Sequence, residues 1–98
     1  MKVIYDRRIQ NDLRTALAYY DAEGGPALGD RFFAEAEHAI ARVTARPQIF
    51  HFAAPGLRRA GLRSFPYHFL YEEKPGSIRF LVLRHDKRHP SFGLRRLL

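Results

Sequence analysis

The hydrophobic pattern of this chain changes its period at Pro47, and this change limits the folds open to it. Before Pro47, apolar residues recur at steps of three and four, the period of a helix packed along one face. After Pro47, short apolar runs rich in aromatic and branched residues are separated by glycine and proline, which is typical of strands. Helices followed by strands predict an α+β domain, and we expect it to span residues 1–98.

Two helices are expected after a short first strand at residues 3–5. The first helix presents an apolar face made of Ile9, Leu13, Ala16, Leu17 and Tyr20. Residues 23–26, Glu-Gly-Gly-Pro, should end it, because glycine accepts the C-cap conformation and proline can open the next helix. The second helix is expected at residues 27–46, since the residue before Pro47 is driven out of the helical region. So short a connection predicts an antiparallel helix hairpin.

Three strands are expected after the helices, at residues 57–63, 67–72 and 78–85. The sequence Lys-Pro-Gly-Ser at 74–77 suits a tight turn between the last two, and the last strand should be central and covered on both faces. The predicted order is β-α-α-β-β-β, with the helix hairpin on one face of a small antiparallel sheet. The tail, residues 89–98, is too short to assign.

The positive charge lies in the second half of the chain. The formal net charge is +7. Residues 1–46 carry seven basic and seven acidic side chains, whereas residues 47–98 carry ten basic and three acidic ones and four of the five histidines. This asymmetry indicates a nucleic acid, a nucleoprotein machine or an acidic protein as partner. A solvated basic face that serves only solubility is the alternative.

Several classes of protein are disfavoured. The chain has no cysteine, so disulfides, thiol catalysis and cysteine zinc sites are excluded. Charged residues stand where a signal peptide needs an apolar run, and the longest apolar run, residues 80–83, is far too short to span a membrane. We expect a cytoplasmic protein without cofactor or membrane partner.

Two segments of the second half carry a family resemblance. Residues 62–71, Leu-Arg-Ser-Phe-Pro-Tyr-His-Phe-Leu-Tyr, resemble the R-x-F-P-Y-x-h-x-Y segment (h, apolar) of ParE-type toxins. Residues 82–90, Val-Leu-Arg-His-Asp-Lys-Arg-His-Pro, resemble the strand ending in h-x-H-x-x-R-x-P of the same family. The chain therefore resembles the RelE/ParE superfamily of type II toxins, closest to the ParE-like toxins of plasmid stabilisation systems.

The resemblance implies a toxin bound by a cognate antitoxin with an acidic C-terminal segment. Contact with operator DNA would then run only through the antitoxin. ParE-like members inhibit DNA gyrase, whereas RelE-like members cleave mRNA in the ribosome. We predict gyrase inhibition without catalysis, with ribosome-dependent endoribonuclease activity as the alternative. A basic nucleic-acid-binding module with no toxicity is a third hypothesis.

The chain lacks some of the residues that RelE-like enzymes use to cleave RNA. By alignment with RelE-like enzymes, Arg59 matches one basic catalytic position, His68 replaces an arginine and Arg88 matches another arginine. Gly61 stands where a lysine is expected, and the position of the C-terminal tyrosine falls near Leu94. If the chain is a ribonuclease, the candidates are Arg59, His68, His85 and Arg88, because an imidazole titrates near neutrality.

Five residues are predicted to contact the target, namely Arg59, Arg63, Arg84, His85 and Arg88. For two of them a structural role is equally open: Arg63 pairing with Glu72 or Glu73, and His85 packing at the end of the sheet. The flanking cations disfavour a metal at residues 85–89 and favour a phosphate or a carboxylate.

The predicted antitoxin contacts are Tyr67, Phe92, Leu94, Arg95 and Arg96. An acidic amphipathic segment would cover this apolar and basic tail, either as an added strand or as a helix in a groove. A frayed terminus, and a Tyr67 that packs in the core, are the structural alternatives.

Overall fold

The computed structural model describes residues 1–97, and their helices pack on a single five-stranded sheet. In chain order the elements are β1 (Lys2–Tyr5), α1 (Ile9–Gly24), α2 (Pro26–Ala45), β2 (Phe52–Ala54), β3 (Leu57–Gly61), β4 (Tyr67–Lys74), β5 (Ser77–His85) and the 3₁₀ helix η1 (Leu94–Leu97). The strand order in the sheet is β1-β5-β4-β3-β2. Leu98, part of the predicted tail, lies outside the described residues.

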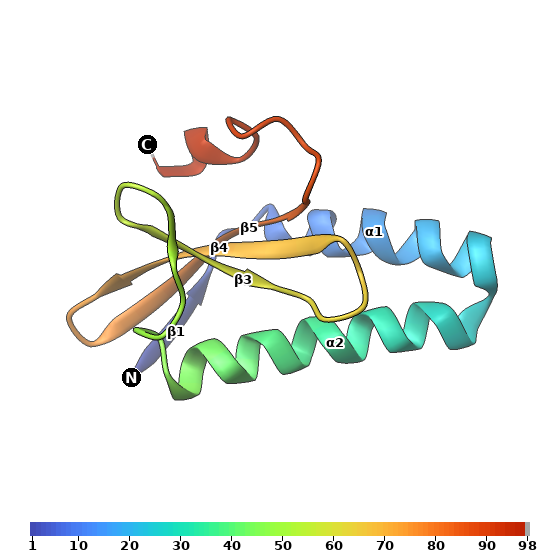
Figure 1. The fold of residues 1–98 in the computed structure, drawn as a ribbon, viewed down its shortest axis with the longest axis horizontal. Coiled ribbons are helices and arrows are strands. Elements are labelled where there is room, and N and C mark those ends of the chain that lie inside the picture. Colours follow the sequence, from blue (N-terminus) through green and yellow to red (C-terminus); the bar gives the residue numbers. More distant parts are fainter. Residues whose placement is uncertain (98) are drawn as a thin grey trace.

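The predicted helix hairpin is confirmed, and α1 and α2 lie side by side in Figure 1. Gly25 separates them with φ of 80°, a backbone conformation that favours glycine, and its N–H donates to the Asp21 carbonyl. Pro26 then opens α2, one residue earlier than expected. Arg46, with φ of −144°, has left the helical region before Pro47.

The sheet differs from the all-antiparallel prediction in one strand. β1 pairs with β5 in parallel, with Lys2 opposite Ser77 and Tyr5 opposite Phe80, so the sheet is mixed. Two helices separate β1 from the other strands in the sequence. No local sequence pattern therefore specifies which later strand pairs with β1, or in which direction. The three-residue β2 was also missed, because its residues are largely exposed.

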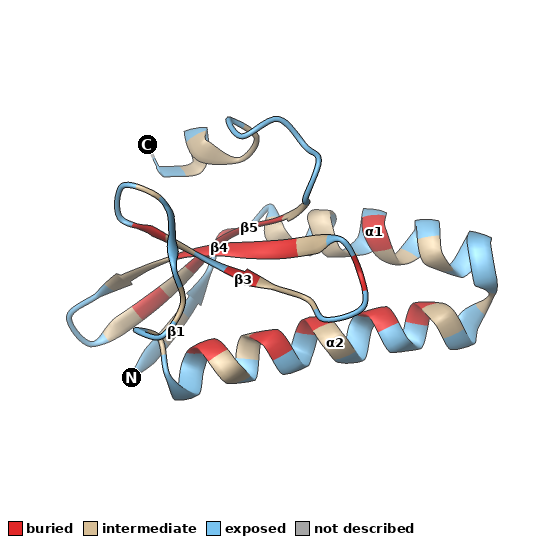
Figure 2. Ribbon diagram, in the orientation of Figure 1, coloured by how far each residue is buried: buried red, intermediate tan, exposed pale blue. Residues whose placement is uncertain are grey.

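β4 and β5 are buried on both faces (Figure 2), as expected for the last strand. One face packs on the helices through residues such as Phe32, Phe69 and Phe80. The other face carries a second core, made of Leu57, Leu70, Leu81 and Val82.

The C-terminal segment covers this second core from the side opposite α2 (Figure 1). Phe92 and Leu94 pack against it. Gly93 permits the close approach, because its φ is 87° and an added Cβ would lie 2.8 Å from Cγ2 of Val82. The tail is therefore a built part of the fold through residue 97.

The loop between β3 and β4, which carries the first family-like segment, is held by aromatic packing. Phe65 is buried, with its ring 4.7 Å from that of Tyr20 and 5.2 Å from that of Phe32. Tyr67 packs on Phe32 at 5.3 Å. The phenylalanine and the tyrosine of that segment therefore attach the sheet to the helix hairpin.

Tyr71 fixes the end of α2 to the sheet. Its hydroxyl donates a 2.7 Å hydrogen bond to the Pro47 carbonyl, and burial raises its pKa to about 12.

Among residues 1–97, no helix has the length and apolar character needed to cross a bilayer.

Replacing Tyr71 by Phe should lower the free energy of unfolding by about 1–2 kcal/mol, because the half-buried Pro47 carbonyl loses its donor. Urea denaturation measures this. Tyr19→Phe is the matched control, since Tyr19 is 56% exposed. Equal losses in both variants would contradict the role given to this hydrogen bond.

Candidate functional site

One edge of β5 lacks a partner strand along its second half. The pairing with β1 ends at Phe80, so the backbone of residues 81–85 faces no strand on that side. Two side chains take over part of the pairing: Asp12 accepts the N–H of Leu83 at 3.1 Å, and Arg96 donates to the carbonyl of Leu81 at 3.0 Å. The edge is thus closed by groups from α1 and from the tail.

Asp12 and Arg96 are also bound to each other. The Arg96 guanidinium donates to both carboxylate oxygens of Asp12, at 2.6 and 2.9 Å. Their side chains are only 6% and 9% exposed, and a pair so buried must have matched geometry to offset its desolvation. Arg96, predicted to contact an antitoxin, is placed inside the protein.

A second polar network lies on the face of the sheet that the tail partly covers. We call it the His68 network; its members are Arg59, His68, Arg84 and Asp86. His68 Nδ1 lies 2.8 Å from Asp86 Oδ1, Arg84 Nε donates to His68 Nε2 at 2.9 Å, and Arg59 Nη2 lies 3.2 Å from Asp86 Oδ1. The guanidinium of Arg84 also donates to the carbonyls of Pro90 and Phe92.

The His68 network fixes the protonation state of its histidine. Arg84 can only donate, so His68 Nε2 accepts and Nδ1 carries the proton toward Asp86. Burial lowers the pKa of His68, the hydrogen bond to Asp86 opposes this less strongly, and Arg59 and Arg84 lower it further. The imidazole is therefore neutral, with both nitrogens engaged.

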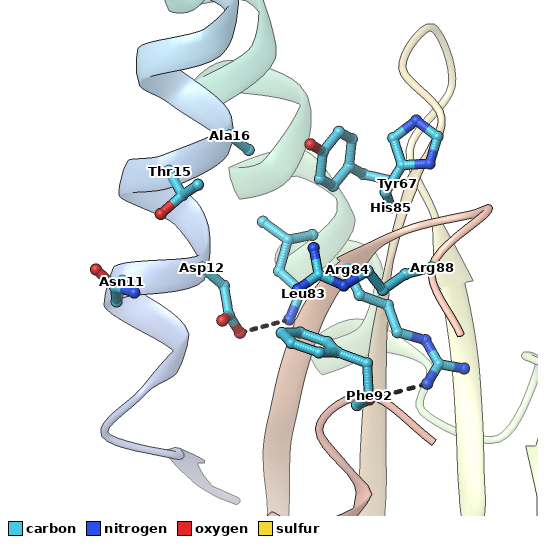
Figure 3. A pocket seen from close by; sticks show the side chains of 10 residues that line it. All are labelled: Asn11, Asp12, Thr15, Ala16, Tyr67, Leu83, Arg84, His85, Arg88 and Phe92. Atoms are coloured by element: carbon cyan, nitrogen blue, oxygen red, sulfur yellow. Dashed lines mark hydrogen bonds between the residues drawn. The ribbon is translucent and has the colours of Figure 1, made fainter. Parts of the chain in front are cut away.

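Five of the predicted site residues line one cavity of about 310 Å³ at the open edge of β5 (Figure 3). They are Tyr67, Arg84, His85, Arg88 and Phe92. We call this cavity the edge pocket; the rest of its lining is Asn11, Asp12, Thr15, Ala16 and Leu83. It brings together residues predicted for target binding and for antitoxin binding.

The aromatic rings of the edge pocket are packed against other side chains of the protein. The guanidinium of Arg88 lies 4.1 Å from the centre of the Phe92 ring, a cation–π contact. The rings of Tyr67 and His85 meet edge to face at 5.1 Å. His85 Nδ1 accepts the N–H of Lys87, which leaves its Nε2 as a donor.

Helix α1 supplies one wall of the edge pocket that the sequence analysis missed. Asp12 points from α1 toward Leu83 of β5 (Figure 3), and Asn11 and Thr15 of the same helix also line the pocket. The sequence held one signal for Asp12. It lies four residues before Ala16, on the apolar face of the helix. A carboxylate on a buried face is costly unless a donor or a cation binds it. No pattern marks Asn11 or Thr15.

Three other predicted residues lie outside the edge pocket and the His68 network. Arg63 is exposed in the loop after β3, which ends at Gly61, and not on a strand as predicted. Its proposed pairing with Glu72 or Glu73 is wrong, because those carboxylates face Arg79 and Arg58. The other two, Leu94 and Arg95, lie in η1; Leu94 packs on the second core and Arg95 is exposed.

The charges of the two halves are joined in the folded chain. Arg79 and Arg96 of the second half bind Asp6 and Asp12 of the first, at 2.9 and 2.6 Å. The side-chain hydrogen bond from Arg8 lowers the pKa of Asp6 to about 2. Part of the basic excess of residues 47–98 is therefore paired with carboxylates of residues 1–46 and does not form a free cationic surface.

The similarity of this chain to known proteins lies in its fold. No family model matches the sequence, and no curated protein matches it. A solved structure titled "Chromosomal ParDE TA system from P. aeruginosa" contains a chain of similar fold, with a TM-score of 0.71 and 19% identity. The match covers 87% of this chain and 95% of that chain. The fold expected from the resemblance is confirmed: two helices packed on a sheet, as in a ParE-like toxin.

Replacing Asp12 by Asn should lower the free energy of unfolding by about 3 kcal/mol or more, because Arg96 is left buried without a counter-charge. Thermal and urea unfolding measure the loss. Asp30→Asn, on the exposed side of α2, should change it by no more than about 0.5 kcal/mol. A loss no larger than the control's would show that the pair is dispensable.

Stability should fall as the pH drops from 7.5 to 5.5. The folded pKa of His68 lies below its unfolded value of about 6.5, so the unfolded chain binds the proton more readily. The stabilisation is complete above the unfolded pKa and is lost as pH falls toward the folded one. Urea midpoints across this window should decline less in His68→Gln; parallel declines would remove His68 as the cause.

Proposed function

We propose that this chain is the toxin of a type II toxin–antitoxin pair, ParE-like in kind, and that it inhibits DNA gyrase without catalysis. The observation that carries the proposal is the shared fold with a chain of a ParDE system over 87% of this chain. The two family-like segments support it: residues 62–71 form the β3–β4 loop and the first half of β4, and residues 82–90 form the end of β5 and the loop after it.

The state of the nuclease candidates favours inhibition by binding. A general base or acid needs a nitrogen that can reach the substrate, and both nitrogens of His68 are already bonded within the protein. The last tyrosine of the chain, Tyr71, is buried and bonded to Pro47. Arg59 is held by Asp86. Two of the four nuclease candidates, His68 and Arg59, thus have structural partners, and no tyrosine stands near the C-terminal catalytic position.

The target surface proposed here is formed by exposed cations. Arg63, Lys87, Arg88 and Arg95 are exposed, and no carboxylate pairs with any of them among the described residues. Such cations steer and hold an acidic or nucleoprotein surface. We assign the antitoxin contact to Tyr67, Phe92, Leu94 and Arg95, because half-buried apolar groups lie there beside exposed charge. Arg96 is left out because Asp12 holds it.

The acidic segment of the antitoxin would compete for the same cations. Phe92 and Leu94 already contact the second core, so a covering segment would complete their burial. Neutralisation then follows from occupancy of the tail and its neighbouring charges. This arrangement requires no change in the sheet.

Induced expression of the chain alone should arrest growth, and co-expression with its antitoxin should relieve the arrest. The purified protein should inhibit gyrase supercoiling at micromolar concentration. Arg63→Gln should weaken inhibition several-fold, because an exposed charge contact to the target is lost. Arg14→Gln, which removes an exposed charge on α1, is the control and should act as the unchanged protein does.

Two results would overturn this assignment. Unchanged supercoiling together with cleaved mRNA in a translating extract would identify a ribonuclease, and the loss of cleavage in Arg88→Ala would support that. Harmless expression, with nucleic-acid affinity that falls with salt at a log–log slope of about −0.9 per phosphate contacted, would identify a binding module.

A further inference from the structure

We propose that the edge pocket is a binding site for a phosphate ester of nucleotide size, with Arg88, His85 and Thr15 holding the phosphate. The site shares Arg88 with the proposed target surface and Tyr67 and Phe92 with the proposed antitoxin contact, and ligand binding to it can be tested without either partner. The proposal rests on the unused donors of the pocket, on the compensated charge of Asp12, on the two sides from which the donors come, and on the size of the cavity.

The first support is a set of hydrogen-bond donors that the protein leaves unused. Asn11, Thr15, Tyr67 and Arg88 line the pocket, and within residues 1–97 their side chains make no hydrogen bond to the protein; Tyr67 is half-buried and the other three are exposed at the mouth of the cavity. His85 adds its Nε2. A cavity with so many free donors fits a ligand that is rich in acceptor oxygens.

The second support is the state of the one carboxylate in the lining. Asp12 could repel an anion, but its Oδ1 accepts from Arg96 and its Oδ2 accepts from Arg96 and from the N–H of Leu83. The charge of Asp12 is thereby compensated by Arg96. The charges of Arg84 and Arg88 in the lining have no carboxylate of the pocket to compensate them. The net field in the pocket favours an anion.

The third support is the direction from which the donors come. Asn11 and Thr15 stand on α1, whereas Tyr67, His85 and Arg88 come from the sheet and the following loop (Figure 3). Donors on opposite walls suit the several oxygens of a tetrahedral phosphate better than the two coplanar oxygens of a carboxylate.

The volume of the pocket indicates that the phosphate carries a larger group. A cavity of about 310 Å³ is at the lower end of the range for small-molecule sites and exceeds what a bare phosphate fills. Its remaining walls include Ala16, Leu83 and the rings of Tyr67 and Phe92. These apolar walls can pack against the organic group of a phosphate ester.

The pocket is distinct from the His68 network. Leu83 and Tyr67 belong to the core on the helix side of the sheet, whereas His68 stands next to Tyr67 on β4 and faces the other way. Arg84 alone takes part in both. The nucleotide site therefore does not use Arg59 or His68.

Binding is to be measured by calorimetry and by NMR titration of the labelled full chain. The probes are the four ribonucleoside 5′-monophosphates, inorganic phosphate, glutamate, and a short 5′-phosphorylated RNA. We expect nucleotides to bind more tightly than inorganic phosphate, glutamate to bind more weakly than phosphate, and resonances of Thr15 and His85 to shift. Tighter binding of the RNA than of the nucleotides would assign the site to a chain end, and the reverse to free nucleotide.

Variants locate the binding. Arg88→Gln should weaken nucleotide binding about tenfold or more, through loss of a charge-assisted hydrogen bond. Thr15→Val, nearly isosteric on the surface of α1, should weaken it by a few-fold, with unchanged thermal stability as the check on folding. Arg46→Gln removes an equal charge far from the pocket and should leave binding unchanged.

Three results would overturn the proposal. Equal weakening in Arg88→Gln and Arg46→Gln would mean that the affinity is diffuse electrostatics. Inorganic phosphate binding as tightly as the nucleotides would leave the rest of the cavity without a ligand. Shifts confined to residues outside the edge pocket would place the binding elsewhere.

Discussion

The ion pair between Asp12 and Arg96 joins parts of the chain that are 84 residues apart, and the edge pocket depends on it. The two side chains bond to each other and also to the N–H of Leu83 and the carbonyl of Leu81. They stand where a further strand would be, and they close part of an edge that would otherwise be open to another chain. Because the tail is fixed in this way, Phe92 forms a wall of the edge pocket.

The cations of the second half divide into two groups with different tasks. Arg79, Arg84 and Arg96 donate to carboxylates or carbonyls of the protein, and these bonds hold the tail on the sheet. Arg63 and Arg88 remain exposed without a carboxylate partner in the described chain. The net charge of the chain is therefore larger than the charge available to a partner, because some of the arginines are bonded within the protein. The exposed group is what an acidic surface or a phosphate meets.

The sequence was informative where its signals are local. The helix hairpin, the turn between β4 and β5 and the burial of β5 on both faces follow from periodicity, glycine and proline. So does the gathering of basic residues near the end of β5, which the resemblance also marked. The roles of individual residues were harder to predict. His68, for example, was a candidate acid or base, but both of its ring nitrogens are hydrogen-bonded within the protein, to Asp86 and Arg84.

What the sequence by itself determined is the two helices, the four longer strands and the side chains able to recognise an anion, because these depend on residue type and near neighbours. Only the tertiary structure decided that β1 lies parallel to β5, that Asp12 binds Arg96, and that α1 supplies a wall of the edge pocket. These contacts join residues far apart in the chain. Their choice rests on which buried backbone and charged groups need partners once the core has packed, a condition that arises only in the folded protein.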